Sequence, residues 1–252
     1  MSSYTALITG SSRGFGKSLA FAVSSKYPNS TIYLLSRPSS HHTETFNNLK
    51  KAHTDGTVHK VDIDFNDAAD TDNPNNNYIN VFKDCIEGIP VPTSSSNKIV
   101  LYNNHGTLGH LTASPPLSSV PIDLNLNITS CISLSLLFSS RFPLSSIVNV
   151  SSLAALKPFP TWSLYCASKS ARDMFHHCLS LSHPTLKTLS YAPGAMDTDM
   201  QSHIRLNESD VEMKEAFVKM KEEGKLVDPD VSARKCVELV EVGKEGHVDY
   251  WD

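Results

Sequence analysis

The order of elements near the N-terminus constrains the fold of this chain more than any other feature. An apolar run at residues 5–9 leads into a glycine-rich segment at residues 10–16, and a helical pattern follows over residues 15–26. A second apolar run lies at residues 31–36. Because two parallel strands need a crossover connection, usually a helix, this order predicts a βαβ unit and therefore a parallel sheet.

The same alternation continues toward the C-terminus. Further short apolar runs lie at residues 58–63, 99–102, 147–150 and 186–191. Helical patterns occupy residues 78–87, 124–140, 164–181, 211–223 and 231–242. We predict mobile surface loops in the polar segments 67–77 and 90–97. The alternation resumes after each of them, so we predict one domain, residues 1–252, with an α/β fold and a doubly wound parallel sheet.

The composition excludes several classes of protein. Hydrophobic residues make up 40% of the chain, and 22 Lys and Arg stand against 26 Asp and Glu with no basic stripe, so nucleic-acid binding is not expected. The five cysteines are widely spaced and the histidines lack metal-ligand spacing, so we expect reduced thiols and no metal site. The N-terminus lacks signal-peptide features and no apolar run reaches about 18 residues, so we expect a cytoplasmic protein with no membrane partner.

The glycine-rich segment carries the first chemical signal. Gly10, Gly14 and Gly16 form a GxxxGxG pattern in the first strand-to-helix turn. Glycine is needed where the backbone turns sharply and where a pyrophosphate approaches the free N–H groups of a helix N-terminus. The pattern indicates a dinucleotide site, and the alternative is a tight turn without a ligand.

The residue after the second predicted strand indicates which dinucleotide binds. An NAD site places an acidic residue there to hold the ribose hydroxyls, whereas this chain has Arg37. A guanidinium at this position, together with Arg13, can pair with a 2′-phosphate, which favours NADPH or NADP⁺. The alternative for Arg37 is an ordinary solvated surface arginine.

A second chemical signal combines three side chains. Ser152 follows a predicted strand, and Tyr165 and Lys169 are spaced i and i+4, so a helix would place both on one face. A Tyr and Lys pair alone is common on protein surfaces. The preceding Ser152 makes a catalytic set the better interpretation.

These motifs, with Asn103-Asn104-His105-Gly106 and Pro193-Gly194, resemble the short-chain dehydrogenase/reductase family across nearly the whole chain. Strings at residues 149–175, 191–201, 224–233 and 247–252 are similar to members that reduce pterins. The resemblance implies a Rossmann-type sheet of seven strands in the order 3-2-1-4-5-6-7. It also implies NADPH-dependent reduction of side-chain carbonyls on a pterin, towards tetrahydrobiopterin, by a homodimer joined through residues 124–140 and 164–181.

The resemblance also implies the roles of single residues. Ser152 would hydrogen-bond the substrate carbonyl and Tyr165 would give it a proton, while Lys169 would bind the nicotinamide ribose and lower the pKa of the tyrosine. Asn127 would complete this tetrad through a water relay. A free tyrosine has a pKa of about 10, and a nearby ammonium stabilises its phenolate, so these roles are physically reasonable.

The binding residues follow by the same resemblance. Cofactor contacts are expected at Gly10, Ser12, Arg13, Gly14, Phe15, Gly16, Arg37, Asp64, Phe65, Asn103, Lys169, Met196, Asp197, Thr198, Asp199, Met200 and Gln201. Substrate contacts are expected at Ser152, Leu153, Tyr165, Gly194 and Asp249. The chain departs from the family's NNAG motif at His105, which adds bulk and a titratable group near the cofactor.

Asp249 distinguishes a pterin reductase from a general carbonyl reductase. Its carboxylate could accept two parallel N–H bonds from the amino-pyrimidinone edge of a pterin, a geometry that a simple ketone cannot use. A general diketone or aldehyde reductase would keep Ser152, Tyr165 and Lys169 but need no such anchor. A non-catalytic NADPH-sensing or scaffold protein would be expected to have lost part of the tetrad.

Overall fold

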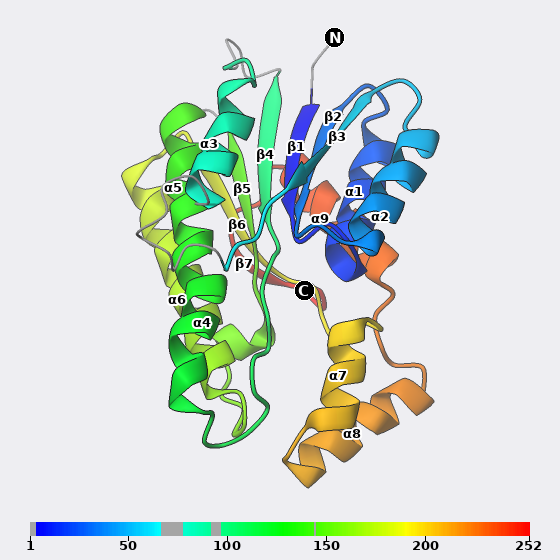
Figure 1. Cartoon of the computed structure of the whole chain (residues 1–252), viewed down its shortest axis with the longest axis vertical. Helices are drawn as coiled ribbons and strands as arrows, with labels where there is room; N and C mark the ends of the chain where they lie inside the picture. Colours follow the sequence, from blue (N-terminus) through cyan, green and yellow to red (C-terminus); the bar gives the residue numbers. More distant parts are fainter. Residues whose placement is uncertain (1–3, 67–77, 92–96, 144) are drawn as a thin grey trace.

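The computed structural model describes residues 4–66, 78–91, 97–143 and 145–252. Its centre is a parallel sheet of seven strands in the order β3-β2-β1-β4-β5-β6-β7, which confirms the predicted fold class (Figure 1). The strands are β1 (Tyr4–Thr9), β2 (Thr31–Ser36), β3 (Thr57–Asp62), β4 (Lys98–Asn103), β5 (Ser146–Val150), β6 (Lys187–Ala192) and β7 (Gly246–Asp249). The loop predicted at residues 67–77 lies outside the described residues. Of the loop predicted at residues 90–97, residues 92–96 also lie outside them.

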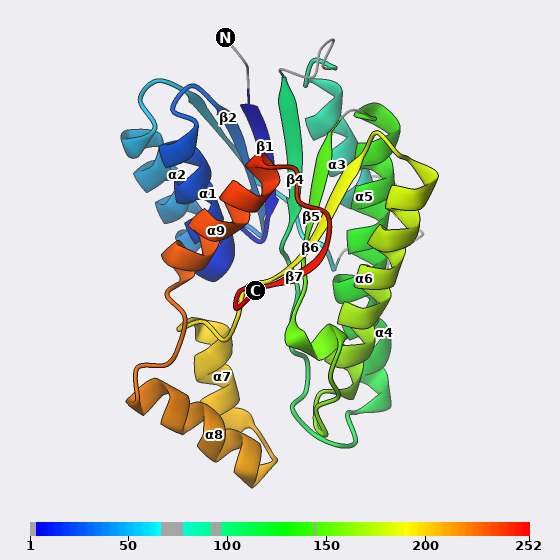
Figure 2. The ribbon, with the colours of Figure 1, turned by 180° about the vertical axis from the view of Figure 1, so that it is seen from behind.

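Helices cover both faces of the sheet. One face carries α1 (Gly14–Lys26), α2 (Ser40–Ala52) and α9 (Pro229–Glu241). The other carries α3 (Tyr78–Glu87), α4 (Val120–Leu124), α5 (Ser130–Arg141) and α6 (Ser163–Ser182), as Figure 2 shows from behind. Beyond the carboxyl ends of the strands, α7 (Asp199–Asn207) and α8 (Val211–Glu222) form a projecting pair.

The core lies in two apolar layers, one on each side of the sheet. The central strands are buried almost throughout, as expected for a parallel sheet covered on both faces. Ile8 and Val148 belong to the layer under α1 and α9, whereas Leu7 and Ile147 belong to the layer under α3 and α5. Neighbouring residues of a strand therefore point to opposite layers, which fixes the register of the sheet.

The structure corrects two of the helix predictions. Helix α2 was not predicted, because its sequence is mostly polar and it buries only His42, Thr45 and Leu49. The single helix predicted at residues 124–140 is divided into α4, a π-helical turn at Asn125–Thr129 and α5. Hydrophobic periodicity does not distinguish a π turn from an α turn when the apolar face continues on both sides.

One continuous helical stretch, Leu117–Arg141, is long and apolar enough to cross a membrane by length and composition alone. Leu134 and Phe138 on this stretch are fully buried in the layer under α3 and α5. The core helix of a water-soluble protein passes the same test, so the finding is weak evidence for a membrane span.

Candidate active site

The predicted site residues converge at one edge of the sheet. Because all seven strands are parallel, their carboxyl ends lie on the same side of the molecule, where open α/β sheets bind ligands. β4 ends at Asn103, β5 ends shortly before Ser152, and β7 ends at Asp249. The register pairs Val150 with Tyr191 on β6, and Ala192 with Asp249.

The glycine loop has the shape that a pyrophosphate requires. Gly10 and Gly14 have φ of 63° and 53°, in the left-handed region that favours glycine. A Cβ on Gly16 would lie 2.3 Å from the carbonyl oxygen of Gly10, so α1 can approach the loop only at a glycine. Arg13, the N-cap residue of α1, makes no side-chain capping bond, and the first turn of the helix has no acidic residue. The N-terminal N–H groups of α1 therefore fit an anionic ligand.

The predicted adenosine contacts are of two kinds. Arg37 is exposed directly after β2, and Asp64 is half-buried with its carboxylate accepting a bond from the backbone N–H of Asn66 at 3.0 Å. In contrast, the rings of Phe15 and Phe65 are buried, and Phe65 stacks on His105 with ring centroids 4.0 Å apart. The rings of these two phenylalanines are therefore packed mainly against the protein itself.

Asn103 is turned away from the cleft. Its side-chain amide is fully buried and donates to the carbonyl oxygen of Cys131 at 2.9 Å and to the hydroxyl of Ser135 at 3.1 Å. The neighbouring Asn104 instead donates to the carbonyl oxygens of Thr9 and Gly10, at 2.9 and 3.2 Å. Asn104, which the sequence analysis did not assign, therefore supports the glycine loop.

Ser152, Tyr165 and Lys169 meet where β5 passes α6. Lys169 Nζ donates to the carbonyl oxygen of Val150 at 2.6 Å and lies 5.4 Å from the centre of the Tyr165 ring. Ser152 is hydrogen-bonded to Tyr165 and caps a short 3₁₀ helix, Leu153–Ala155, by accepting from the N–H of Ala154. The three predicted side chains therefore form one cluster.

Burial controls the ionisation of this cluster. It raises the pKa of Tyr165 to about 12, against the opposing effects of the hydrogen bond with Ser152 and the charge of Arg172. Burial and the neighbouring Arg172 hold the pKa of Lys169 well below its ordinary value. In this structure the hydrogen bond with Ser152 and the charge of Arg172 are the influences that lower the pKa of Tyr165, and the effect of Lys169 on the tyrosine stays a prediction.

Asn127 lies in the π-helical turn between α4 and α5, where it is buried. Its Oδ1 accepts from the backbone N–H of Thr107 at 2.8 Å, and its Nδ2 donates to the carbonyl oxygen of Thr107 at 2.9 Å. Both bonds hold the segment after β4 against the helix. Single π turns inside α-helices are frequent at functional sites, and this one contains a predicted member of the tetrad.

His105 is neutral and structural in this arrangement. Its Nδ1 lies 2.9 Å from the Thr9 hydroxyl and its Nε2 lies 2.7 Å from the Ser130 hydroxyl, which itself donates to the carbonyl oxygen of Leu126. Ser130 therefore accepts from Nε2–H, and Nδ1 accepts from Thr9. Burial, with the charges of Arg172 and Lys169, holds the pKa of His105 well below its ordinary value. The added imidazole thus joins β1 to the helix that carries Asn127.

The segment predicted to cover the nicotinamide is only partly a loop. Met196, Asp197 and Thr198 precede α7, whereas Asp199, Met200 and Gln201 form its first turn. The backbone N–H of Asp197 donates to the carbonyl oxygen of Val227 at 3.3 Å, and Asp199 forms an ion pair with Arg13 at 3.0 Å. Gln201 is buried and donates to the carbonyl oxygen of Phe217 on α8. Gln201 therefore holds α7 to α8 and does not face the cleft.

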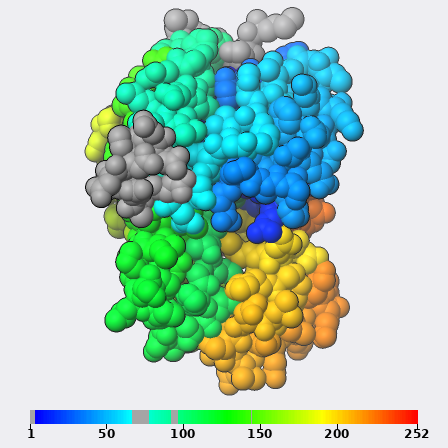
Figure 3. Space-filling view, viewed as in Figure 1, coloured from blue at the N-terminus to red at the C-terminus, as the bar shows by residue number. Residues whose placement is uncertain are grey.

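A third apolar cluster packs the projecting helices against the active-site segment. It includes Leu108, Trp162, Tyr165 and Ile204, with Phe217 of α8 stacked on Trp162 at 5.7 Å between ring centroids. Figure 3 shows the yellow and orange atoms of α7 and α8 beside the green atoms of the segment around α4. The projecting pair thus closes one side of the region around Tyr165.

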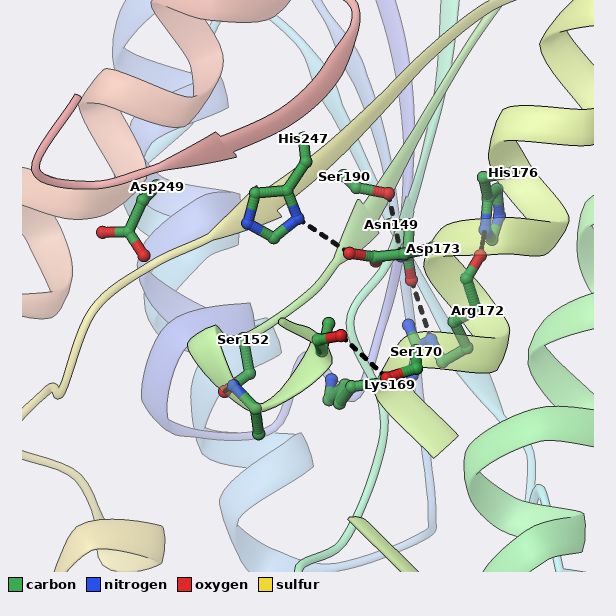
Figure 4. Close-up of polar contacts among 12 residues, drawn as sticks. Asn149, Ser152, Lys169, Ser170, Arg172, Asp173, His176, Ser190, His247 and Asp249 are labelled. Carbon is green, nitrogen blue, oxygen red and sulfur yellow. Dashed lines mark hydrogen bonds and ion pairs between the residues drawn. The ribbon is translucent and has the colours of Figure 1, made fainter. Parts of the chain in front are cut away.

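The predicted substrate contacts lie around the same edge. Leu153 is exposed, and Gly194 has φ of 83° and lies close to Val227 and Tyr250, so a side chain there would clash. Asp249 is half-buried and its Oδ1 accepts from the backbone N–H of Trp251 at 3.1 Å. In Figure 4, Asp249 and Ser152 both lie to the left of α6, with Asp249 above Ser152.

Arg172 is a buried residue that the sequence analysis did not assign. Its guanidinium donates to the carbonyl oxygens of Asn103 and His105 and to Oδ1 of Asn149, and it has no exposed surface. Tyr165, Lys169, Arg172 and His176 share one buried face of α6 at helical spacing. A polar stripe on a face that should be apolar was the signal that could have identified Arg172.

A parallel sheet with a dinucleotide cradle and a Ser-Tyr-Lys cluster at its carboxyl edge is characteristic of nicotinamide-dependent oxidoreductases. A family model described as short chain dehydrogenase matches residues 4–209. The chain belongs to the short-chain dehydrogenase/reductase family and is an oxidoreductase.

The chain is also similar to individual proteins of known activity and to solved structures. The chain is 33% identical to a sepiapterin reductase from Meriones unguiculatus, over 98% of this chain and 95% of that protein. It is 31% identical to a benzil reductase, (S)-benzoin forming, from Bacillus subtilis, over 95% and 94%. A crystal structure of a short-chain dehydrogenase/reductase from Saccharomyces cerevisiae superposes with a TM-score of 0.82 at 24% identity, over 99% of this chain and 96% of the other.

Proposed function

We propose that this oxidoreductase uses NADPH to reduce side-chain carbonyls of a pterin, such as sepiapterin or 6-pyruvoyl-tetrahydropterin, towards tetrahydrobiopterin. The observation that carries the proposal is the position of Asp249 at the end of β7, on the sheet edge that also holds Ser152 and Tyr165. The similarity to sepiapterin reductases over nearly the whole chain supports it.

NADPH, when bound, supplies the hydride to the carbonyl carbon. Tyr165 holds the proton for the carbonyl oxygen, because a tyrosine hydroxyl has an ordinary pKa of about 10, which burial raises here, and is therefore protonated at neutral pH. Ser152 and Tyr165 can both donate to that oxygen as its negative charge develops. Lys169 orients the nicotinamide ribose, and Asn127 supports the water path by which Tyr165 is reprotonated.

Replacing Asp249 by alanine tests the substrate class. Each charge-assisted hydrogen bond is worth about 1.5 to 3 kcal/mol, so kcat/KM for sepiapterin should fall at least about tenfold. A small diketone cannot reach this carboxylate, so its turnover should change little, and NADPH affinity should stay the same. Steady-state kinetics with both substrates measures the difference.

Asp249→Asn is the matched control for this test, because it keeps an acceptor for the backbone N–H of Trp251 while removing the charge. It should lose activity on sepiapterin but keep it on the diketone. Equal losses for both substrates in Asp249→Ala would indicate a structural C-terminus. No loss for either would support the second candidate function.

That second candidate is a general NADPH-dependent diketone or aldehyde reductase. The similarity to benzil reductase favours it, because such an enzyme needs Ser152, Tyr165 and Lys169 but no pterin anchor. The Asp249 variants separate the two functions.

Arg37 should decide between the two nicotinamide cofactors. Its exposed guanidinium follows β2, where it can pair with a 2′-phosphate but offers little to a free hydroxyl. We expect Arg37→Asp to weaken NADPH binding and to favour NADH relatively. Fluorescence titration of both cofactors measures this, and a wild-type preference for NADH would contradict the assignment.

We also propose that the protein is a cytoplasmic homodimer. Helices α5 and α6 expose Leu136, Met174 and Leu181, apolar side chains that an interface between two copies would cover. The five free cysteines are consistent with a reducing compartment. Sedimentation equilibrium of the purified protein tests the oligomeric state.

A further inference from the structure

A row of polar side chains crosses the last three strands of the sheet. Asn149 of β5 is in register with Ser190 of β6, and Ser190 is in register with His247 of β7. Residues in register on neighbouring parallel strands point to the same face, here the face that α6 covers. Polar side chains in this position need partners from the helix, because buried polar groups without hydrogen bonds are costly.

Asp173 of α6 supplies the partner for two members of the row. Its Oδ1 accepts from Asn149 Nδ2 at 2.8 Å, and its Oδ2 lies 2.7 Å from His247 Nδ1 (Figure 4). A carboxylate can only accept here, so Nδ1 of His247 carries the proton. The side chains of Asp173 and His247 are 15% and 21% exposed, so water screens this pair little.

The contacts continue from Asp173 to the catalytic region. Asn149 also accepts from Arg172 Nε at 2.7 Å, and Arg172 in turn binds the carbonyl oxygens of Asn103 and His105. The amide of Asn149 therefore connects the buried cation of Arg172 with the anion of Asp173. His247 is thus fixed to the same helix face that carries Tyr165 and Lys169.

β7, the strand that carries His247, depends on the contact with Asp173 to stay against α6. β7 is a short strand at the edge of the sheet, paired with β6 alone within the described part of the chain, and it carries Asp249 two residues after His247. On the opposite face, Val248 packs into the layer under α1 and α9. The Nε2 atom of His247 is buried without a partner among the described residues, so the bond from Nδ1 to Asp173 is the side-chain hydrogen bond that holds the ring in place.

We propose that Asp173 and His247 are positioning residues that hold β7 against α6 and so set the distance between the Asp249 carboxylate and the Ser152–Tyr165 pair. This inference rests on the proposed function, because it assigns to the pair the geometry by which a pterin is selected. His247 touches no reacting atom and acts through Asp249.

Two variants of His247 test the inference. His247→Leu removes the bond to Asp173, whereas His247→Asn can place its Nδ2 near the position of Nδ1 and restore it. In His247→Leu the KM for sepiapterin should rise at least about fivefold, because small displacements of a binding group cost large factors in positioning. Its kcat/KM for a small diketone and its NADPH affinity should stay within about twofold. His247→Asn should return the KM for sepiapterin close to the wild-type value.

A second readout does not depend on any substrate. Hydrogen exchange of the cofactor-loaded protein should become faster in the segment 246–252 of His247→Leu and stay unchanged in β6. His59→Leu is the matched control, because His59 lies on β3, the edge strand at the other end of the sheet, where its ring stacks on Tyr33. That variant should change neither readout.

The outcomes separate this inference from the proposed function. A wild-type protein that does not reduce sepiapterin defeats the proposed function, while hydrogen exchange still reports on the contact. If the Asp249 variants show the pterin effect but His247→Leu leaves KM and exchange unchanged, the positioning role is wrong. Equal losses on both substrates in His247→Leu, or no recovery in His247→Asn, would likewise overturn it.

Discussion

Replacing Tyr165 by phenylalanine is expected to lower kcat by about 10² to 10⁴-fold, the usual contribution of a positioned general acid. The ring belongs to the apolar cluster with Trp162 and Ile204, and phenylalanine preserves that packing. Only the hydroxyl and its hydrogen bond with Ser152 are lost. The fold and NADPH binding should therefore survive, as measured by thermal unfolding and by cofactor fluorescence.

Tyr33→Phe is the control for this experiment. Tyr33 lies on β2 and stacks on His59. In the strand order of the sheet, β2 is separated by β1 and β4 from β5, the strand that precedes Ser152, so Tyr33→Phe should keep full turnover. Activity of Tyr165→Phe within a factor of about three of the wild type would remove Tyr165 from the chemical step.

Gly16→Ala is expected to destabilise the protein and to abolish cofactor binding together. The new Cβ would lie 2.3 Å from the carbonyl oxygen of Gly10 and 2.5 Å from Asn104 Nδ2. The Gly10 oxygen belongs to the backbone of the loop that begins α1, so it cannot move without displacing that loop. Overpacking of this kind costs about 2 to 3 kcal/mol, which lowers Tm by about 5 to 10 °C in a chain of this size.

Gly14→Ala provides the comparison. The nearest atom to its Cβ would be Cγ2 of Thr198 at 3.5 Å, an ordinary contact, so only the positive φ opposes the change, at about 1 kcal/mol. Calorimetry should therefore show a smaller loss of Tm for Gly14→Ala. Equal Tm values for Gly16→Ala and the wild type would contradict the close approach of α1 to the loop.

The sequence predicted the parts of the fold that repeat a local pattern. Apolar runs identified six strands, of which the central ones are buried on both faces and the edge strand β3 has no buried residue. β7 followed only from the family resemblance, since its four residues carry a weak pattern. The glycine loop and the Tyr165–Lys169 spacing are local as well. Helix α2 was missed because its buried side chains include His42 and Thr45, which do not produce an apolar stripe.

The remaining parts of the candidate site depend on contacts between distant segments. Arg172 binds the backbone carbonyls of Asn103, at the end of β4, and of His105, and no pattern around Arg172 indicates these partners. The side-chain amide of Asn103 binds Cys131 and Ser135 of α5, a contact that no local pattern around Asn103 indicates. The pKa of Tyr165 depends on burial, which is a property of the packed structure and not of the Tyr-Lys spacing.

The π-helical turn at Asn125–Thr129 has a consequence for engineering this protein. A regular α-helix has better hydrogen-bond geometry, so deleting one residue from the turn should make the helix more robust to heat while displacing Asn127 from Thr107. Directed evolution that selects survivors of heating alone would favour such deletions. A screen for thermotolerant catalysts from this chain should therefore measure turnover in every round.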